Sequence, residues 1–317
     1  MLQVSPENRI VADAVHHHLH SEDLVAVDVV AADNNGVLYK LSSEHDTRHL
    51  LLVSARIPCF EEARDQVGAA FWEERLGALL VPRAEASFHL TVRVDAEALR
   101  GEGEAEKARV CSLVSRLHSD TEGAPLRVAL SALSRGGRAP GDHYALHPRD
   151  GCAVHVVPKA ERVLVYFVIS FADPTEQALA AVFLQEMEIV RRNDKSLSRA
   201  PLITYSAHPP AELRGRLPPA DAEAPLGFLS FGLDREHVSD ETRLERAVGL
   251  LATYRGYVLY HVQCAKAHMH QRMRAQVNGW LQVLHRAVPD RPGAARKTAS
   301  GRTFKRQGRA GPGPEEQ

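Results

Sequence analysis

The densest cluster of potential metal ligands in the sequence is the run His16-His17-His18-Leu19-His20 near the N-terminus. His16 and His20 are four residues apart, so a helix would place both imidazoles on one face, where such a pair can bind a transition metal. No cysteine or paired carboxylate lies at ligand spacing nearby. We therefore interpret the run as the solvated end of a helix and expect no metal site there.

The sequence contains none of the common spacings for nucleotide binding or catalysis. It has no GxxxxGK(S/T) phosphate loop, no GxGxxG before a helix, no HExxH and no GxSxG. Serine, aspartate and histidine are abundant, but without a motif none can be assigned to a catalytic triad. The four cysteines lie at least 41 positions apart, which is typical of buried thiols in a reduced cytosolic compartment. We therefore expect no enzymatic activity and no cofactor.

The composition is that of a folded globular chain. Of the 317 residues, 44% are apolar and 25% are charged, and no apolar run is long enough to span a membrane. The first fifteen residues lack the basic and apolar regions of a secretory signal. At about 100–200 residues per domain, the length allows two domains.

The net charge of −1 conceals an uneven distribution. Between Arg255 and Arg309 there are twelve arginines and lysines and a single acidic residue, Asp290. The preceding part of the chain therefore carries a strong acidic excess. A basic C-terminal arm favours an acidic partner, such as an actin filament, nucleic acid or anionic lipid. A solvated helix face followed by a soluble tail explains the same charges.

Hydrophobic periodicity predicts an α+β fold in which one module, a helix layer on an antiparallel sheet, occurs twice in the order α-β-β-β-α-β-β-α. Asp33-Asn34-Asn35-Gly36 is typical of a hairpin turn. The polar stretch Ser119–Gly123 predicts a boundary, so the first module would span 1–122. Its helices are expected over 6–20, 60–76 and 104–118, and its strands over 24–31, 37–41, 49–57, 78–81 and 87–94.

The second module is expected over 123–238. The segment 162–171 is apolar on both faces, so we expect a central strand there. Asp173 and Pro174 are typical of a helix N-cap and of the first helical residue. The other elements are expected as helices over 124–134 and 174–192 and strands over 143–147, 152–157, 202–205 and 226–233.

A long helix is predicted after Ser239 or Asp240, because no proline follows until Pro289. We assign 239–289 to this helix and 290–317 to a basic, flexible tail. The helix would be about 70 Å long, against about 35 Å for a domain of this size. Its apolar stripe therefore either packs on the other module or docks a partner helix. The stripe positions expected at such an interface are Tyr254, Val258, Val262, Ala265, Met269, Met273, Val277 and Leu281.

Several segments resemble one protein family, in the same order along nearly the whole chain. Residues 260–275 match the pattern Y-H-x-x-C-x-K-A-x-x-H-x-R-M-R-A, and residues 297–304 match K-T-x-x-G-(K/R)-T-F. Shorter matches occur at 32–39, 182–192, 209–213 and 284–290. With these segments the chain resembles the family of the thirty-four-kilodalton subunit, subunit 2, of the actin-related protein 2/3 complex.

The resemblance implies a structural core subunit of an actin-nucleating complex, found in the cytoplasm and cytoskeleton. It implies two similar modules and pairing with the twenty-kilodalton subunit of the complex through antiparallel C-terminal helices. It also implies binding to the side of a mother actin filament, which supports branched nucleation. On this basis we expect filament contacts from the basic residues Arg191, Arg192, Lys266, Arg272, Arg274, Lys297, Arg302, Lys305 and Arg306.

Two other functions are compatible with parts of the sequence. The basic arm could bind lipid or nucleic acid, but past the matched helix it has only Trp280 and Phe304 as aromatic residues. The module order also resembles that of bacterial secretion chaperones, which are short homodimers. A doubled module with so long a helix is a poor match to them.

Overall fold

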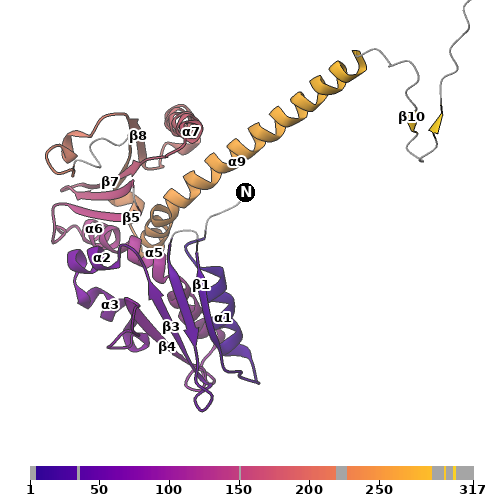
Figure 1. Cartoon of the computed structure of the whole chain (residues 1–317). Coiled ribbons are helices and arrows are strands. Elements are labelled where there is room, and N and C mark those ends of the chain that lie inside the picture. Colours follow the sequence, from indigo (N-terminus) through magenta and orange to yellow (C-terminus); the bar gives the residue numbers. More distant parts are fainter. Residues whose placement is uncertain are drawn as a thin grey trace, which may run out of the picture. The chain divides into compact units, whose positions relative to one another are not determined.

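The computed structural model describes residues 5–33, 36–149, 151–218 and 227–287, and the backbone of 296–297 and 303–304. It confirms a mixed fold of helices and antiparallel sheets (Figure 1). The chain divides into two units, Met1–Ala265 and Lys266–Gln317. The first unit holds both large sheets and the helices that cover them. None of the described helices combines the length and the apolar composition that a membrane span requires.

The first sheet has four antiparallel strands in the order β1-β2-β3-β4. They are β1 (Asp28–Ala32), β2 (Leu38–Ser42), β3 (Leu50–Arg56) and β4 (Leu90–Asp95). Helices α1 (Arg9–His20) and α4 (Glu104–Ser115) pack against each other and bury their apolar residues against this sheet. Strand alternation places one set of side chains in this core, namely Tyr39, Leu41, Leu51, Val53, Val92 and Val94.

The predicted hairpin between β1 and β2 is confirmed. The Asp33 N–H donates to the Val37 carbonyl (3.0 Å), and the Asp33 side chain accepts from the Val37 N–H (3.1 Å). Gly36 has a φ of 79°, a conformation that residues with a Cβ rarely adopt. Asn34 and Asn35, which belong to the same predicted turn, lie outside the described residues.

The helix expected over 60–76 is two helices, α2 (Phe60–Val67) and α3 (Ala69–Leu76). Gly68 separates them with a φ of 86°. Because the apolar residues on both sides of Gly68 keep a helical spacing, periodicity alone did not indicate the break. The change of direction matters for the fold, since α2 and α3 contact different parts of the second module.

The strand expected over 78–81 is instead a short 3-10 helix, η1 (Gly77–Leu79), followed by a single bridge between Leu80 and Val92. The Val81 N–H donates to the Thr91 carbonyl (2.9 Å), so this segment still covers the outer edge of β4. The first module therefore has one strand fewer than the predicted order.

The polar stretch Ser119–Gly123, expected to be a break between the modules, contributes to helix α5 (Leu117–Glu122). Its polar side chains are buried because they have partners within the fold: the Thr121 hydroxyl donates to the Leu117 carbonyl, and Ser119 donates to Pro6 (2.7 Å each). Helix α6 (Ala124–Ser134) follows directly after Gly123. The module boundary between 122 and 123 stays a prediction.

The second sheet has five antiparallel strands in the order β5-β6-β7-β9-β8. Its middle strand is β7, which confirms the prediction for the segment apolar on both faces. Helices α6 and α7 bury apolar side chains on one face of this sheet, and Leu213 packs with residues of the other. The strands are β5 (Tyr144–Arg149), β6 (Cys152–Pro158), β7 (Arg162–Ile169), β8 (Leu202–Ser206) and β9 (Phe228–Asp234).

Two predicted helix starts are confirmed by hydrogen bonds. Asp173 caps α7 (Pro174–Asn193) by accepting from the Thr175 N–H at 2.7 Å. Asp240 accepts from the Arg243 N–H at 2.9 Å at the start of α9 (Glu241–Ala287). The remaining elements are η2 (Lys195–Leu197), η3 (Ala211–Leu213), η4 (Arg235–Val238) and the paired strands β10 (Arg296–Lys297) and β11 (Thr303–Phe304).

The outer edge of β5 is closed by two side chains from α2. Gln66 accepts from the Ala145 N–H (2.8 Å) and donates to the Ala145 carbonyl (2.5 Å). Glu62 accepts from the His147 N–H (2.7 Å). These bonds replace a neighbouring strand and join α2 of the first module to the second sheet.

Candidate interaction surface

The inner part of α9, up to Ala265, packs into the core of the second module through residues as far as Val262. Tyr254, Val258 and Val262 were expected at a partner interface, but all three are buried within this chain. Their positions follow the buried residues Leu244, Val248 and Leu251 at helical spacing. We therefore remove these three residues from the expected interface, because the second module already covers them.

Aromatic contacts fix this part of α9 to the sheet. The Tyr254 ring lies 4.9 Å from that of Phe231 and 5.3 Å from that of Phe167. Its hydroxyl lies 3.0 Å from the sulfur of Met187 on α7, and burial raises the pKa of Tyr254. Phe183 of α7 stacks on His261 at 5.7 Å. The inner part of α9 is thus held between the sheet and α7.

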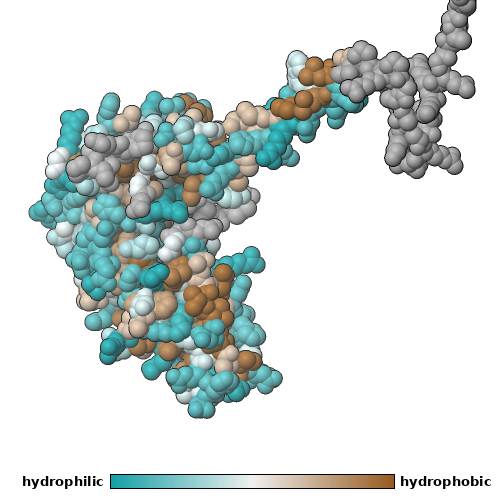
Figure 2. Space-filling model, in the orientation of Figure 1, coloured by the Kyte–Doolittle hydropathy of each residue, from teal (hydrophilic) through white to brown (hydrophobic). Residues whose placement is uncertain are grey.

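The outer part of α9, Lys266–Ala287, exposes its apolar residues. Met273, Val277 and Leu281 each have more than half of their surface accessible, Ala265 is exposed and Met269 is partly exposed. Figure 2 shows apolar atoms along this part of the helix. Trp280 and Leu284 are similarly exposed, although neither was among the expected interface residues. Their spacing from Met273 and Val277 could have identified them.

The exposed residues continue the face that is buried further upstream. At about 100° per residue, positions separated by three, four or seven residues share one side of a helix. The buried set Leu244, Val248, Leu251, Val258 and Val262 is followed at this spacing by Met269, Met273, Val277, Trp280 and Leu284. We call these last five residues the outer stripe.

Two of the expected filament-contact residues are engaged within α7 and the segment after it. The Arg191 guanidinium donates to the carbonyls of Ala200 (2.7 Å), Pro201 (3.1 Å) and Ser198 (3.2 Å). It therefore stabilises the turn between α7 and β8. Arg192 is exposed and forms an ion pair with Glu188 one turn earlier.

The other expected filament contacts lie on α9 and beyond it. Arg272 and Arg274 are exposed on the outer part of α9, and Lys266 is partly buried. The backbone of Lys297 belongs to β10, but its side chain is outside the description. Arg302, Lys305 and Arg306 lie outside the described residues.

Charged residues join the start of α9 to the first module. Glu245 accepts from Arg127 at 2.7 Å, from Arg75 at 3.0 Å and from Arg116 at 3.5 Å. Arg75 also binds Asp120 of α5 at 3.0 Å. Burial alone would raise the pKa of Glu245, but the hydrogen bonds and charges of Arg127 and Arg75 outweigh it and lower the pKa to about 2.

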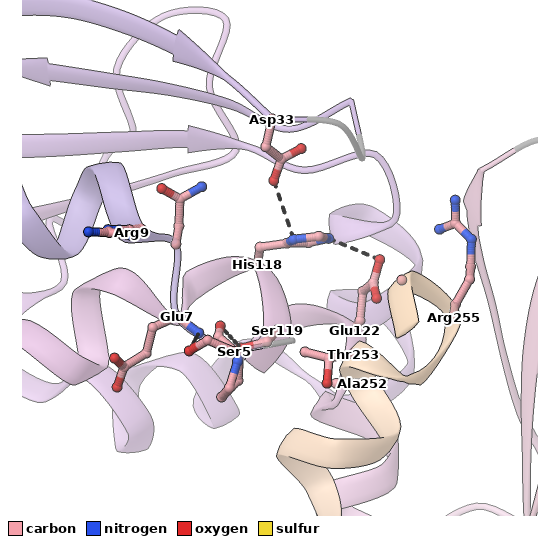
Figure 3. Close-up of a pocket in the computed structure, with 13 residues that line it drawn as sticks. Ser5, Glu7, Arg9, Asp33, His118, Ser119, Glu122, Ala252, Thr253 and Arg255 are labelled. Atoms are coloured by element: carbon pink, nitrogen blue, oxygen red, sulfur yellow. Dashed lines mark hydrogen bonds and ion pairs between the residues drawn. The ribbon is translucent and has the colours of Figure 1, made fainter. Parts of the chain in front are cut away.

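A cavity of about 250 Å³ lies beside this junction, lined by α5, the hairpin after β1, the N-terminal segment and α9 (Figure 3). In it, His118 bridges Asp33 (3.6 Å) and Glu122 (3.0 Å). Burial would lower the pKa of His118, but the charges of Glu122 and Asp33 raise it. His118 thus links the β1–β2 hairpin to α5.

The histidine run forms the C-terminal end of helix α1. His16 and His20 stack with their ring centroids 4.1 Å apart. One ring nitrogen of His20 bonds the His16 carbonyl (2.7 Å), and the other bonds Glu104 of α4 (2.9 Å). Within the described ranges, no group of three or more His, Cys, Asp or Glu residues could hold a metal ion.

Comparison with known proteins gives matches over most of the chain. Residues 53–291 match the sequence model of a family described as "Arp2/3 complex, 34 kD subunit p34-Arc". A Dictyostelium discoideum protein named actin-related protein 2/3 complex subunit 2 is 28% identical over 306 residues, covering 96% of this chain and 99% of that protein. A Schizosaccharomyces pombe protein of the same name is 28% identical over 323 residues, covering 96% of this chain and 100% of that protein.

Proposed function

The chain belongs to the p34-Arc family, that of subunit 2 of the Arp2/3 complex, and we propose that it pairs with the twenty-kilodalton subunit and binds the side of an actin filament. In this role it is a structural subunit of an actin-nucleating assembly in the cytoplasmic cytoskeleton. Its partners are the other subunits of the complex and the mother filament. It contributes a rigid surface from which a branch grows.

The outer stripe carries this proposal. Its apolar residues lie on the face of α9 that is buried upstream, yet the described chain leaves Met269 partly exposed and the other four exposed. A contiguous apolar surface of this kind marks a site that another protein covers. The stripe follows steps of three and four residues from Met269 to Leu284, which is more than four helical turns. This spacing suits a helix of the partner packed along α9.

The basic residues beside the stripe support a second, charged contact. Arg272 and Arg274 are the neighbours of Met273 in sequence, so they lie about 100° to either side of it on the helix. A partner that covers the stripe would leave their guanidinium groups at the rim of the interface. There they can reach an acidic filament surface, with each exposed ion pair worth about 0.2–1 kcal/mol.

The pairing is tested by co-expressing this chain with the twenty-kilodalton subunit and measuring the yield of the pair. Val277→Asp places a charge at the centre of the stripe, and we expect it to reduce the recovered pair by about tenfold or more. Asn278→Asp adds the same charge to the adjacent position, away from the stripe, and should leave the pair intact.

Thermal unfolding of each variant alone separates a binding defect from a folding defect. Because Val277 is exposed, Val277→Asp should melt at the same temperature as the unchanged chain. Equal recovery of the pair with Val277→Asp and Asn278→Asp would contradict the proposed interface. The filament contact requires a separate test with the assembled complex.

A further inference from the structure

The two large sheets have four outer edges: β1 and β4 in the first sheet, β5 and β8 in the second. An edge strand presents unpaired N–H and C=O groups to which another extended chain can add. Folded proteins normally cover such edges with a helix, a loop or charged side chains. An edge strand that the rest of the chain leaves uncovered is therefore a candidate site for strand addition.

Three of these edges are closed within the chain. The edge of β4 is covered by the segment that includes Val81, which bonds Thr91 at 2.9 Å. The edge of β5 is closed by the α2 side chains described above. At β8, Glu188 of α7 accepts from the Tyr205 N–H at 3.1 Å, and Arg191 binds the carbonyls just before the strand.

The edge of β1 has no such cover among the described residues. Ser43 donates to the Val27 carbonyl, and Asp33 donates to the Val37 carbonyl, which fixes the alternation of the ladder with β2. In an antiparallel pair, every second residue directs its N–H and C=O away from the neighbour. Asp28, Val30 and Ala32 therefore direct theirs outward, and no described residue bonds them there.

Apart from Asp28 at its start, β1 lacks the side chains that usually prevent strand addition. The strand has no proline, lysine or bulge, and its five pairs with β2 are in continuous register. Val29 and Val30 point to opposite faces of the sheet and are 50% and 63% exposed. Figure 2 shows apolar atoms gathered where β1 lies in Figure 1. Both faces of this edge are thus available to an apolar neighbour.

The charge around the edge selects the kind of neighbour. From Ser21 to Asp28 the chain carries three acidic residues and no lysine or arginine, and Lys40, opposite Val30 on β2, is paired with Glu85. One of them, Asp28, is exposed on β1 itself. A strand that adds here gains from lysine or arginine opposite Asp28 and at its ends, because cross-strand pairs of opposite charge are favourable.

We propose that the outer edge of β1 accepts an extended, basic segment of another protein chain as a fifth strand of the first sheet. The backbone groups of Asp28, Val30 and Ala32 provide the main-chain hydrogen bonds. Val29 and Val30 contact β-branched or other apolar residues of the added strand on the two faces. This site is separate from the outer stripe on α9, so it does not depend on the proposed pairing.

The test uses the full chain and two synthetic peptides, Lys-Thr-Val-Val-Thr-Val-Lys and the same sequence with glutamate at both ends. We expect the basic peptide to bind and to slow amide hydrogen exchange over residues 24–33. Val30→Lys, which places a like charge at the centre of the edge, should weaken this binding about tenfold or more. Val30→Pro removes the central outward N–H and should have a similar effect.

Leu202→Lys is the matched control, since Leu202 is also exposed on an edge strand but on the closed edge of β8. It should bind the basic peptide as the unchanged chain does. Failure of the basic peptide to protect residues 24–33, equal binding of the acidic peptide, or full binding by Val30→Lys would overturn the proposal. Concentration-dependent protection without any peptide would also overturn it, because a second copy of this chain would then occupy the edge.

Discussion

Glu245 is a single carboxylate that contacts three arginines from different elements: α3, the turn between α4 and α5, and α6. With Asp120 it forms a group of three positive and two negative side chains at the junction of the modules. Such a partly buried group stabilises the fold only while every charge keeps a partner. The effect of removing one member can therefore be stated in advance.

Replacing Glu245 with glutamine leaves three guanidinium groups with Asp120 as their remaining carboxylate. We expect Glu245→Gln to lower the free energy of unfolding at neutral pH by about 3 kcal/mol, measured by denaturant titration. Glu73→Gln, an exposed change on α3, should alter it by less than about 0.5 kcal/mol.

The pH dependence identifies the cause of that loss. The pKa of Glu245 is about 2 in the folded chain, against an ordinary value of 4.5. Its contribution is therefore complete above pH 4.5 and disappears as the pH falls toward 2. The stability difference between the unchanged chain and Glu245→Gln should shrink over this range, and a difference that stays constant would contradict the account.

The stability contribution of His118 depends on pH in the opposite direction from that of Glu245. Because Glu122 and Asp33 raise its pKa above the ordinary 6.5, its contribution is complete below pH 6.5 and is lost as the pH rises through the folded value. His118→Gln should therefore cost most stability in mildly acidic solution and progressively less at alkaline pH. Denaturant unfolding at a series of pH values would reveal this, and a larger loss at alkaline pH would refute it.

Helices and strands were predicted correctly where the local sequence signals were strong. The central strand β7 followed from an uninterrupted apolar run, and the start of α7 from Asp173 and Pro174, because strand burial and capping depend on nearby residues. The hairpin after β1 followed from its turn residues. The split at Gly68 was not predicted because the apolar spacing continues across it, and the buried helix α5 depends on contacts with distant segments such as that of Ser119 with Pro6.

The expected partner interface on α9 was only partly correct, because a local pattern does not contain the contacts with distant segments. Periodicity placed the apolar stripe on one face of α9, but it could not indicate where the second module stops covering that face. Burial ends after Val262, so the first three expected residues belong to the core and the remainder to the exposed part. The sequence around Arg191 does not distinguish it from an exposed basic residue. Only the fold shows that its guanidinium bonds a carbonyl of the turn after α7.

The contact between α2 and the edge of β5 can be tested simply by replacing Gln66. Its amide replaces a neighbouring strand for β5, so Gln66→Ala leaves the N–H and carbonyl of Ala145 without these partners. We expect the free energy of unfolding to fall by about 1–2 kcal/mol in a urea titration. Gln185→Ala, exposed on α7, is the control, and an equal effect of both changes would argue against the edge closure.

Over the whole molecule, the charges are distributed so that a basic C-terminal part could bind an acidic filament surface. The excess of arginine and lysine begins at Arg255, while the rest of the chain is acidic. Since single exposed pairs contribute little, only a group of basic residues can provide measurable affinity for an acidic surface. Raising the salt concentration should weaken such a contact.

Reversal of Arg272 and Arg274 to glutamate tests this group. In the assembled complex the double variant should co-sediment less with actin filaments, with the deficit largest at low ionic strength. Arg48→Glu with Arg83→Glu makes the same change in net charge on exposed positions of the first module. If both double variants co-sediment like the unchanged complex, Arg272 and Arg274 are not filament contacts.

Affinity purification can show whether this chain is a subunit whose long helix pairs with another subunit. The tagged chain is recovered from a lysate of its own cells, and the bound proteins are identified by mass spectrometry. We expect recovery of the twenty-kilodalton subunit together with two actin-related proteins, and loss of all three with Val277→Asp. A chain recovered alone, or with the same proteins bound equally well by Val277→Asp, would contradict it.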